Sequence, residues 1–374
     1  MLRVGLDTTP LIGNRTGIGQ FTAGLRQALA PLAHVVDVEM TWRGRRRGTR
    51  PLPARLMRAA WKRSNAAPIE WWTGPLDIMH GTNYVVPPTR RAAQLASVHD
   101  LTAIRFPELC TKDTLDYPDL VLRALRRGAH IHCDSQFVAD EVLDWSHTDE
   151  HRVHVVAPGI PSVMPTEDGI AAADLVSDEY GGEYGGELGG ERPYVLVLGT
   201  IEPRKDHATL LRAFAEVCAA DADLLLVVAG QDGWAIDRYT ETLDSLPSVV
   251  TSRIIRLRSV SDGARDQLVA GARMLVYPSI YEGFGFPPLE AMRAGVPVIA
   301  SAVGSLPEVL GQAAQLVDSG DSAALAAQIL RLHIDDGARA QLITAGIDRA
   351  ARYSWGRCAA EMVGVYEATI EATK

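Results

Sequence analysis

Residues 278–292 read PSIYEGFGFPPLEAM and place Glu282 and Glu290 on the two sides of a bend rich in glycine and proline. The apolar segment before the bend predicts a buried strand, and the segment after it predicts a helix. Gly283 and Gly285 allow unusual backbone dihedrals and the close approach of a ligand, and a first helical turn tolerates proline. Amides and the positive dipole at such a helix start favour an anion such as a diphosphate. The two carboxylates can then flank the same molecule and accept hydrogen bonds from its hydroxyls.

Short apolar segments alternate with segments of helical spacing along the whole chain. This alternation predicts parallel sheets covered by helices on both faces, which is the α/β class. The predicted strands cover residues 3–6, 35–40, 77–79, 94–98, 129–133, 153–156, 194–198, 224–229, 254–257, 274–277, 296–300 and 315–317, and the predicted helices include residues 17–30, 113–127, 136–145, 208–219 and 355–373.

Residues 180–191 interrupt this alternation with a tandem Gly-Gly-Glu repeat. Glycine is costly to order and the acids repel one another, so the repeat predicts a linker between domains. We therefore expect two Rossmann-like, doubly wound domains that face a central cleft, with ligands beyond the carboxyl ends of the strands. The expected bounds are residues 1–165 for the first domain, 166–192 for the linker, 193–354 for the second domain and 355–374 for a last helix.

Composition limits the classes of protein to which the chain can belong. The length of 374 residues suggests two or three domains, and 47% apolar and 22% charged residues are ordinary globular values. The net charge of −9 disfavours nonspecific binding of nucleic acid. The cysteines form no CxxC pair, which argues against a zinc site or a disulfide framework and fits a reducing compartment. No apolar run approaches about 18 residues and the first residues read as a strand, so we expect a cytoplasmic protein without a signal peptide.

A second cluster, LGTIEPRKDH at residues 198–207, follows a predicted strand and precedes a predicted helix. Here Arg204 and Lys205 can neutralise a diphosphate leaving group, the arginine through a fork of donors and the lysine as a point charge. The alternative for this pair is a solvated position on the surface. Glu290 also has an alternative role, as a dipole partner or capping acid in a first helical turn.

Two weaker clusters lie in the first half of the chain. Residues 13–20, GNRTGIGQ, resemble a phosphate-approaching turn through Gly17 and Gly19, but they lack the GxGxxG fingerprint of a dinucleotide site. His99 follows a predicted strand, where it could donate a hydrogen bond to a sugar hydroxyl, shuttle a proton or have a structural role. Neither Asp100 beside it nor any other spacing of His, Asp and Glu indicates a metal site.

Together these blocks resemble the retaining glycosyltransferases of family 4, which have the GT-B fold. The resemblance covers nearly the whole chain and is strongest at residues 278–301, PSIYEGFGFPPLEAMRAGVPVIAS, where seven residues separate Glu282 from Glu290. Residues 198–214, LGTIEPRKDHATLLRAF, and residues 98–108, VHDLTAIRFPE, match further family blocks. The glycine turn and the closing YSW match more loosely.

The resemblance implies that the second domain binds a nucleotide diphosphate-sugar, that the first binds the acceptor, and that the last helix crosses back onto the first domain. It also implies retention at the anomeric carbon, with no metal and no cofactor beyond the nucleotide-sugar co-substrate. The implied catalytic residues are Glu282, His99, Arg204 and Lys205. The implied donor contacts are Glu290 for the ribose, Glu282, Gly283, Phe284 and Gly285 for the sugar, and Arg204 and Lys205 with Gly17 and Gly19 for the diphosphate; the acceptor contacts are His99, Asp100 and Arg105.

The physical chemistry of such a transfer agrees with these roles. Breaking the bond from the anomeric carbon to phosphate puts new charge on the diphosphate, and each well-placed donor stabilises it by about 2.7–4 kcal/mol. No side chain matches a proven nucleophile, so we expect front-face attack in which the departing phosphate takes the acceptor's proton. The expected donor is a GDP- or UDP-linked hexose resembling mannose, and the expected acceptor is a hydroxyl of a glycan, a lipid-linked sugar or a small molecule.

Two other functions stay open on the sequence alone. A nucleotide-sugar epimerase or hydrolase with the same two domains would bind the same donor without needing an acceptor. A non-catalytic nucleotide-sugar binding protein would keep the site without the reaction. A dehydrogenase is disfavoured by the broken glycine fingerprint.

Three features depart from the commoner family pattern. Asp206 stands where Gly or Asn often follows the lysine, residues 181–191 lengthen the connector, and residues 43–63 carry nine Arg or Lys and no acid. A basic amphipathic segment can lie on anionic lipid, at about 1 kcal/mol per basic residue near the surface. The basic stretch at residues 43–63 is therefore either a docking segment for the inner face of the plasma membrane or a solvated loop.

Overall fold

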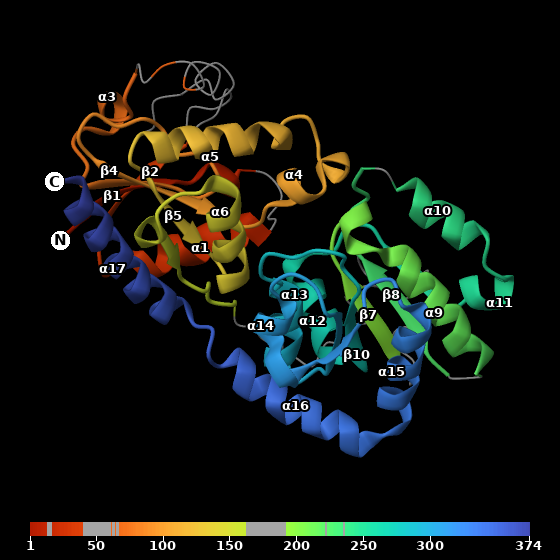
Figure 1. The fold of residues 1–374 in the computed structure, drawn as a ribbon. Helices are drawn as coiled ribbons and strands as arrows, with labels where there is room; N and C mark the ends of the chain where they lie inside the picture. The colour runs from red at the N-terminus through yellow and green to blue at the C-terminus, as the bar shows by residue number, and fades with distance from the viewer. Residues whose placement is uncertain are drawn as a thin grey trace. The chain divides into compact units, whose positions relative to one another are not determined.

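The structure is a computed structural model that describes residues 1–12, 17–39, 61, 64, 67–161, 192–220, 223–234 and 236–374. These residues form two compact units, Met1–Ile160 with Tyr353–Lys374, and Pro161–Arg352 (Figure 1). Each unit is a parallel sheet with helices packed against it, so the predicted α/β class is confirmed. The predicted linker lies outside the described residues except for Arg192, and the basic stretch lies outside them except for Trp61.

The sheet of the first unit has six strands in the order β2-β1-β3-β4-β5-β6, all paired in parallel. This order extends that of flavodoxin-like sheets and places a topological switch point between β1 and β3. The three central strands β3, β4 and β5 are buried along their whole length. The strands are β1 Arg3–Asp7, β2 His34–Val38, β3 Ile78–Gly81, β4 Ala93–Val98, β5 His130–Cys133 and β6 Val153–Val155.

The predicted helices of the first unit are present, and one of them begins later than expected. The helix expected from residue 113 begins at Tyr117, where Pro118 takes a place in the first turn that proline tolerates. Gly17 and Gly19 belong to the helix predicted at residues 17–30, so the turn expected to approach a phosphate does not include them. The helices are α1 Gly17–Leu29, α3 Glu70–Thr73, α4 Thr102–Arg105, α5 Tyr117–Arg126, α6 Gln136–Ser146 and α17 Trp355–Thr373.

The C-terminal helix α17 belongs to the first unit, where it packs against α1 and β4, as the blue and red ribbons of Figure 1 show. The ring centroid of Trp355, the first residue of α17, lies 6.4 Å from the ring centroid of Phe21. A β-carbon at Gly24 of α1 would overlap the Trp355 indole, so only glycine leaves room for this ring. The predicted return of the last helix to the first unit is therefore confirmed.

A buried chain of hydrogen bonds, which we call the histidine chain, joins α17 to the first sheet. Tyr366 Oη lies 2.9 Å from His80 Nδ1, and Ser97 Oγ lies 2.8 Å from both His80 Nε2 and His132 Nδ1. His132 Nε2 lies 2.9 Å from the carbonyl oxygen of Val156, which can only accept, so this nitrogen carries the proton. Burial lowers the pKa of His80 and of His132, so both rings are neutral. The donors therefore run in one direction, from Tyr366 through His80, Ser97 and His132 to Val156.

Replacing Tyr366 by phenylalanine should lower the free energy of unfolding by about 1–3 kcal/mol, because the buried Nδ1 of His80 loses its donor. Urea titration with amide hydrogen exchange in β3 and β4 measures the loss. The control Thr373→Val removes a hydroxyl from the exposed end of the same helix, and it should change stability by less than about 0.5 kcal/mol. Equal stability of Tyr366→Phe and the parent protein would contradict the histidine chain.

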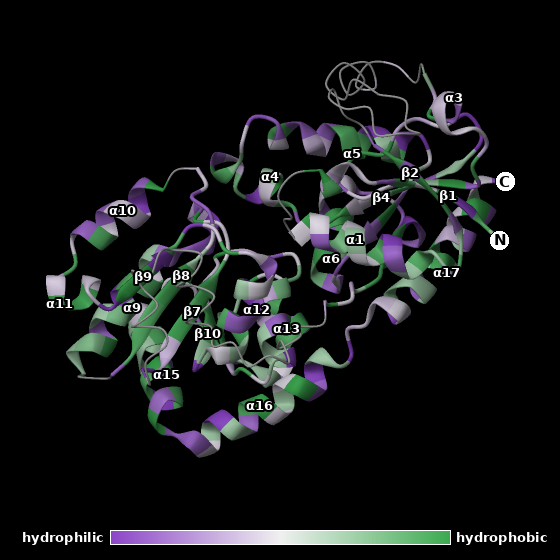
Figure 2. Cartoon of the chain, turned by 180° about the vertical axis from the view of Figure 1, so that it is seen from behind, coloured by the Kyte–Doolittle hydropathy of each residue, from purple (hydrophilic) through white to green (hydrophobic). Residues whose placement is uncertain are grey.

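The sheet of the second unit has six parallel strands in the order β12-β11-β10-β7-β8-β9. Numbered within the unit, this is the Rossmann order 3-2-1-4-5-6, with the switch point between β7 and β10. Figure 2 shows the strands of this sheet as predominantly hydrophobic, as expected for a sheet covered on both faces. The strands are β7 Tyr194–Leu198, β8 Leu225–Ala229, β9 Ile254–Leu257, β10 Met274–Tyr277, β11 Val298–Ser301 and β12 Gln315–Val317.

The helices of the second unit lie between these strands and after the last of them. They are α9 His207–Ala219, α10 Asp237–Asp244, α11 Ser248–Thr251, α12 Asp262–Gly271, α13 Phe286–Arg293, α14 Leu306–Leu310, α15 Ser322–Ile334 and α16 Asp336–Ala350. Every strand predicted from the sequence is present in the two units, with ends shifted by two residues or fewer. Among the described residues no helix combines the length and the apolar character that crossing a bilayer requires.

Candidate active site

Two loops of the second unit meet at the switch point of its sheet. One follows β7 and contains Arg204 and Lys205; the other follows β10 and contains Glu282. Because β7 and β10 are parallel neighbours, both loops leave the sheet at its carboxyl edge. The amide of Ile280 donates to the backbone oxygen of Arg204 at 2.9 Å, and Arg204 Nη1 donates to the backbone oxygen of Tyr281 at 2.9 Å. The fold thus joins the two clusters that the sequence placed 77 residues apart.

The charged side chains of these loops form one group, in which the acids are buried and the cations partly buried, which we call the ion cluster: Glu202, Arg204, Lys205 and Glu282. Arg204 binds Glu202 Oε1 at 2.8 Å and Glu282 Oε1 at 2.9 Å. Lys205 Nζ binds Glu282 Oε1 at 2.5 Å and donates to Tyr277 Oη at 2.5 Å. The two cations and two carboxylates balance. The Arg204–Lys205 pair is therefore part of a partly buried network, and the solvated-surface alternative is wrong.

The protonation states of the ion cluster follow from its packing. Burial alone would raise the pKa of Glu282, but the Arg204 and Lys205 cations outweigh burial and lower that pKa to about 2. Burial lowers the pKa of Lys205, while Glu282 opposes this change. Burial also raises the pKa of Tyr277 well above its usual value, so the phenol is neutral and its oxygen accepts from Lys205. Glu282 is consequently a carboxylate at every physiological pH.

The backbone of Glu282 is held by the loop that follows β11. Ser305 donates to the Glu282 carbonyl oxygen through its amide at 3.0 Å and through its hydroxyl at 3.1 Å. Gly304 has φ +55°, and a β-carbon there would overlap the backbone of Glu282. A side chain at Gly304 would therefore push this glutamate out of place.

Glu290 is fully buried in α13 and forms an ion pair with Arg265 of α12 through its Oε2 atom. Its other oxygen, Oε1, has no hydrogen-bond partner among the described residues. Burial raises the pKa of Glu290, and the Arg265 guanidinium offsets this only in part. Because α13 begins at Phe286, Glu290 lies beyond the first turn, and the alternative that it is a first-turn dipole partner is wrong.

The bend between these glutamates contains Gly285, whose φ of +97° favours glycine. Gly283 and Phe284 precede it, and Phe284 is buried with its ring 5.2 Å from that of Phe286. Pro287 and Pro288 have no N–H, so this helix start supplies fewer amide donors than most. The expected anion contact therefore depends more on side-chain cations than on a row of helix amides.

Asp206, the departure noted after the lysine, has φ +42°, a left-handed conformation that Gly, Asn and Asp adopt most readily. Its Oδ2 atom accepts from the Thr209 hydroxyl at 2.6 Å, and its Oδ1 atom lies 3.5 Å from Arg238 Nη2. The Asp206 carboxylate is thus bound outside the ion cluster. His207, next in the chain, begins α9 and is buried, and burial lowers its pKa to about 3.

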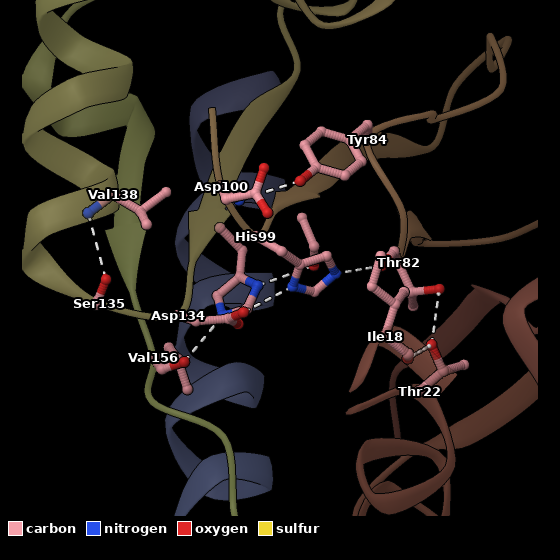
Figure 3. Close-up of polar contacts among 12 residues, drawn as sticks. Ile18, Thr22, Thr82, Tyr84, His99, Asp100, Asp134, Ser135, Val138 and Val156 are labelled. Carbon is pink, nitrogen blue, oxygen red and sulfur yellow. Dashed lines mark hydrogen bonds and ion pairs between the residues drawn. The ribbon is translucent and has the colours of Figure 1, made fainter. Parts of the chain in front are cut away.

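In the first unit, His99 is held between two acceptors at the carboxyl edge of the sheet (Figure 3). Its Nδ1 atom lies 2.6 Å from Asp134 Oδ2, and its Nε2 atom lies 2.8 Å from the backbone oxygen of Thr82. Burial alone would lower the pKa of His99, but the charge and hydrogen bond of Asp134 outweigh burial and raise it. Both ring nitrogens are therefore already bound within the protein.

The other residues expected in the first unit have structural partners. Asp100 Oδ1 accepts from the amide of Thr102 at 2.9 Å, at the start of α4. Arg105 Nε donates to Glu141 Oε1 of α6 at 2.7 Å. Gly17 is the first residue of α1 and Gly19 is buried within that helix, while residues 13–16 lie outside the described part of the chain.

Four functional candidates were missed in the sequence: Glu202, Tyr277, Arg265 and Asp134. Glu202 and Tyr277 lie inside or beside the clusters singled out, so their position at strand ends was an available signal. Asp134 follows β5 as His99 follows β4, which is the same signal on the next strand. Arg265 lies within α12, and no local pattern points to its pairing with a glutamate 25 positions later. In the described residues no group of three or more His, Cys, Asp or Glu could hold a metal ion.

Comparisons with known proteins identify a family and relatives of this chain. The family described as Glycosyl transferases group 1 matches residues 186–349. O-antigen chain mannosyltransferase B of Escherichia coli is 31% identical over 296 residues, which cover 78% of this chain and 74% of that protein. The structure of sucrose-phosphate synthase from Thermosynechococcus elongatus resembles this one with a TM-score of 0.76 at 18% identity, over 98% of both chains. Anabaena Alr3699/HepE, solved with UDP and glucose, has a TM-score of 0.72 at 15% identity, over 98% of this chain and 100% of its own.

The two structures are too distant in sequence to show more than the fold, which is the expected GT-B fold. The match to the Escherichia coli enzyme extends over most of both chains and so establishes their kinship over that length. This chain belongs to the glycosyl transferases group 1 family and is a glycosyltransferase.

Proposed function

We propose that the enzyme transfers a hexose, with retention of anomeric configuration, from a nucleotide diphosphate-sugar to a hydroxyl of a growing glycan. The observation that carries this proposal is the ion cluster at the Rossmann switch point of the second unit. Open parallel sheets bind ligands at this edge, and Arg and Lys there suit a diphosphate. Retention and membership of family 4 are the parts of the proposal that rest on the resemblance of its motifs.

The contacts of Lys205 leave it able to bind a phosphate oxygen. An ammonium group has three N–H donors, and two of them are directed to Tyr277 and Glu282. The third is available to the diphosphate, where its charge counts most as the bond to the sugar breaks. Arg204, bound to the same Glu282 oxygen, is held beside it.

The buried Glu290 Oε1 atom suits a hydroxyl of the donor's ribose. Leaving a buried carboxylate oxygen without a donor is costly, and a ribose hydroxyl would supply one. Glu282, with the backbone at Gly283 and Gly285, is proposed to contact the sugar. The acceptor is proposed to bind in the first unit, near His99 and Asp100 at the sheet edge and Arg105 on the following helix α4.

The proposed route is front-face attack without a protein nucleophile. Glu282 Oε1 is bound by both Arg204 and Lys205, which lowers the electron density that a nucleophile or base needs. The departing diphosphate oxygen then takes the acceptor's proton. A covalent sugar trapped on Glu282 would contradict this route. We also propose that the reaction needs no metal, so the enzyme should keep full activity in excess chelator.

The donor is proposed to be GDP-mannose, with a UDP-hexose as the second candidate. The mannosyltransferase activity of the Escherichia coli relative supports mannose, and the UDP and glucose in the Anabaena structure support a nucleotide-sugar of this general kind. The O-antigen role in the relative's name also supports polysaccharide biosynthesis with a glycan or lipid-linked acceptor.

The increase in stability that each nucleotide gives against unfolding identifies the nucleotide that binds. Analysis of the products then tests the reaction. GDP, UDP, ADP and dTDP are compared, since a ligand at 100 times its Kd adds about 2.7 kcal/mol of stability. The matching nucleotide-sugar is then incubated with and without a mannose-terminated oligosaccharide. Acceptor-dependent release of the nucleotide and a product of retained configuration support the proposal. Isomerisation without acceptor indicates an epimerase, and binding without turnover indicates a non-catalytic protein.

We further propose that the enzyme works in the cytoplasm at the inner face of the plasma membrane, through its basic stretch at residues 43–63. The support comes from the sequence, because this stretch lies outside the described residues except for Trp61. Changing Arg45, Arg46 and Arg47 together to glutamine should weaken binding to liposomes that contain anionic lipid, with roughly 3 kcal/mol as the upper estimate. Cosedimentation measures the effect, with neutral liposomes as the control. Absence of binding by the parent protein would end the membrane proposal.

A further inference from the structure

The two ring nitrogens of His99 both face oxygens that can only accept a hydrogen bond. Asp134 Oδ2, 2.6 Å from Nδ1, belongs to a carboxylate, and the oxygen 2.8 Å from Nε2 is the carbonyl of Thr82. A neutral imidazole has one donor nitrogen and one acceptor nitrogen, so it can satisfy only one of these contacts. Both contacts are hydrogen bonds only if both nitrogens carry a proton.

Three neighbouring strands fix this arrangement. Thr82 follows β3, His99 follows β4 and Asp134 follows β5, so their backbones leave the same edge of the parallel sheet side by side (Figure 3). The ring of Phe21 from α1 packs edge-on against His99, with 5.1 Å between centroids. His99 is 8% exposed and Asp134 is 3% exposed, so water competes little for either contact. The ring is held in one orientation by its packing.

The two other histidine rings that interact electrostatically with His99 in the described part of the chain are neutral. His132 and His80 are neutral members of the histidine chain. Asp134 Oδ1 lies 3.8 Å from His132 Nε2, whose proton goes to Val156 instead. Among the described residues, Asp100 and Tyr84 from the neighbouring loops also face His99.

We propose that Asp134 is a positioning residue that keeps His99 doubly protonated, so that His99 donates a hydrogen bond to an oxygen of the bound sugar and cannot act as the base. The Nε2–H donor directed to Thr82 is the one that a substrate oxygen can share or take over. The functional half of this inference rests on the proposed sugar transfer, whereas the charge state of the ring does not.

Double protonation of His99 determines how the proton leaves the acceptor. His99 has no free lone pair to receive it, because both nitrogens carry hydrogen. The bond from the anomeric carbon to the diphosphate oxygen breaks, the bond from that carbon to the acceptor oxygen forms, and the acceptor's proton moves to the departing diphosphate oxygen. No protein group gains or loses a proton in this scheme.

Nitrogen-15 NMR of the histidine-labelled enzyme tests the charge state without any substrate. At pH 7.5 (about one unit above the usual histidine pKa), both ring nitrogens of His99 should show signals of the protonated type. His132 and His80 should each show one protonated and one unprotonated nitrogen, which makes them internal references. The variant His99→Asn assigns the signal. An unprotonated nitrogen in His99 would overturn the inference.

The pH dependence of transfer tests the role of Asp134. Asp134→Asn keeps the shape of the side chain but removes the charge, so His99 should lose one proton. The kcat/KM of this variant should therefore fall by about 10–100-fold at pH 8 relative to the parent enzyme. The loss should shrink towards pH 5.5, where His99 regains the proton from solvent. The control Asp144→Asn, an exposed site on α6, should follow the parent profile. A loss that is the same at every pH would show a merely structural role and would overturn the inference.

The two measurements separate the possible failures. If no nucleotide-sugar is turned over, the NMR result still decides the charge of His99, and the proposed function is what has failed. If transfer occurs but the NMR shows a neutral ring, the inference has failed and the function stands. Asp134→Glu keeps the carboxylate, so it should retain the doubly protonated ring. If Asp134→Asn does not fold, the nitrogen-15 spectra of the parent enzyme and of Asp134→Glu decide the charge state, and an unprotonated ring nitrogen of His99 in the parent would overturn the inference.

Discussion

Replacing Lys205 by glutamine should lower the kcat of sugar transfer by about 10²–10³-fold, equivalent to about 2.7–4 kcal/mol. The glutamine amide can still donate to Tyr277 Oη or Glu282 Oε1, which Lys205 contacts at 2.5 Å, but the positive charge is lost. That charge is worth most in the transition state, when the diphosphate gains negative charge. The fall in kcat should therefore exceed the rise in the donor KM, as measured by steady-state release of nucleotide.

The matched control for this variant is Lys112→Gln, an exposed lysine of the first unit. It should leave both kinetic constants unchanged and should show that one lost surface charge does not matter. Circular dichroism and a thermal melt establish that Lys205→Gln is folded. Parent-like kcat in a folded Lys205→Gln enzyme would remove the ion cluster from the reaction.

Replacing Glu290 by glutamine should raise the donor dissociation constant by about 10–100-fold, while kcat changes less. A hydrogen bond to a charged group contributes about 1.5–3 kcal/mol, and the ribose is remote from the reacting carbon. The substitution keeps the shape of the side chain, and it also leaves the Arg265 guanidinium without its counter-ion. Isothermal titration calorimetry measures the change directly with the nucleotide diphosphate.

A second ligand makes this result specific to the ribose. The 2′,3′-dideoxy form of the same nucleotide lacks the hydroxyls that Glu290 would bind, so it should bind the parent enzyme and Glu290→Gln with nearly equal affinity. The two changes together form a double-mutant cycle whose coupling energy isolates the contact. Glu241→Gln, at an exposed position of α10, serves as the control. If Glu290→Gln discriminates between the two nucleotides as well as the parent does, Glu290 does not bind the ribose.

Local patterns were sufficient to predict the fold because each element is decided by residues close together in the chain. Fully buried runs such as residues 194–198 and 274–277 are apolar throughout, as parallel strands covered on both faces must be. Part of the ion cluster could be predicted for the same reason, because Arg204, Lys205 and Glu282 all follow such strands. What joins them is the adjacency of β7 and β10, which the Rossmann order creates.

The remaining contacts depend on three-dimensional packing that the local sequence does not encode. Arg265 reaches Glu290 because α12 packs beside α13, and helical spacing alone does not indicate which residue of α12 is nearest. His99 was predicted as a candidate, yet its state depends on Asp134 and on the Thr82 carbonyl. A backbone oxygen has no sequence signature, so the role of His99 could not be chosen before the fold was known.

The return of α17 makes the first unit discontinuous in the chain, and this has a consequence for its synthesis. Domains usually fold in order as the polypeptide leaves the ribosome. Here the unit that is begun first lacks Trp355 and Tyr366 until the final residues have emerged, whereas the second unit is already complete at Arg352. The second unit of the nascent protein can therefore finish folding before the first unit. A premature stop codon in the segment that encodes α17 would consequently damage the amino-terminal unit of the enzyme.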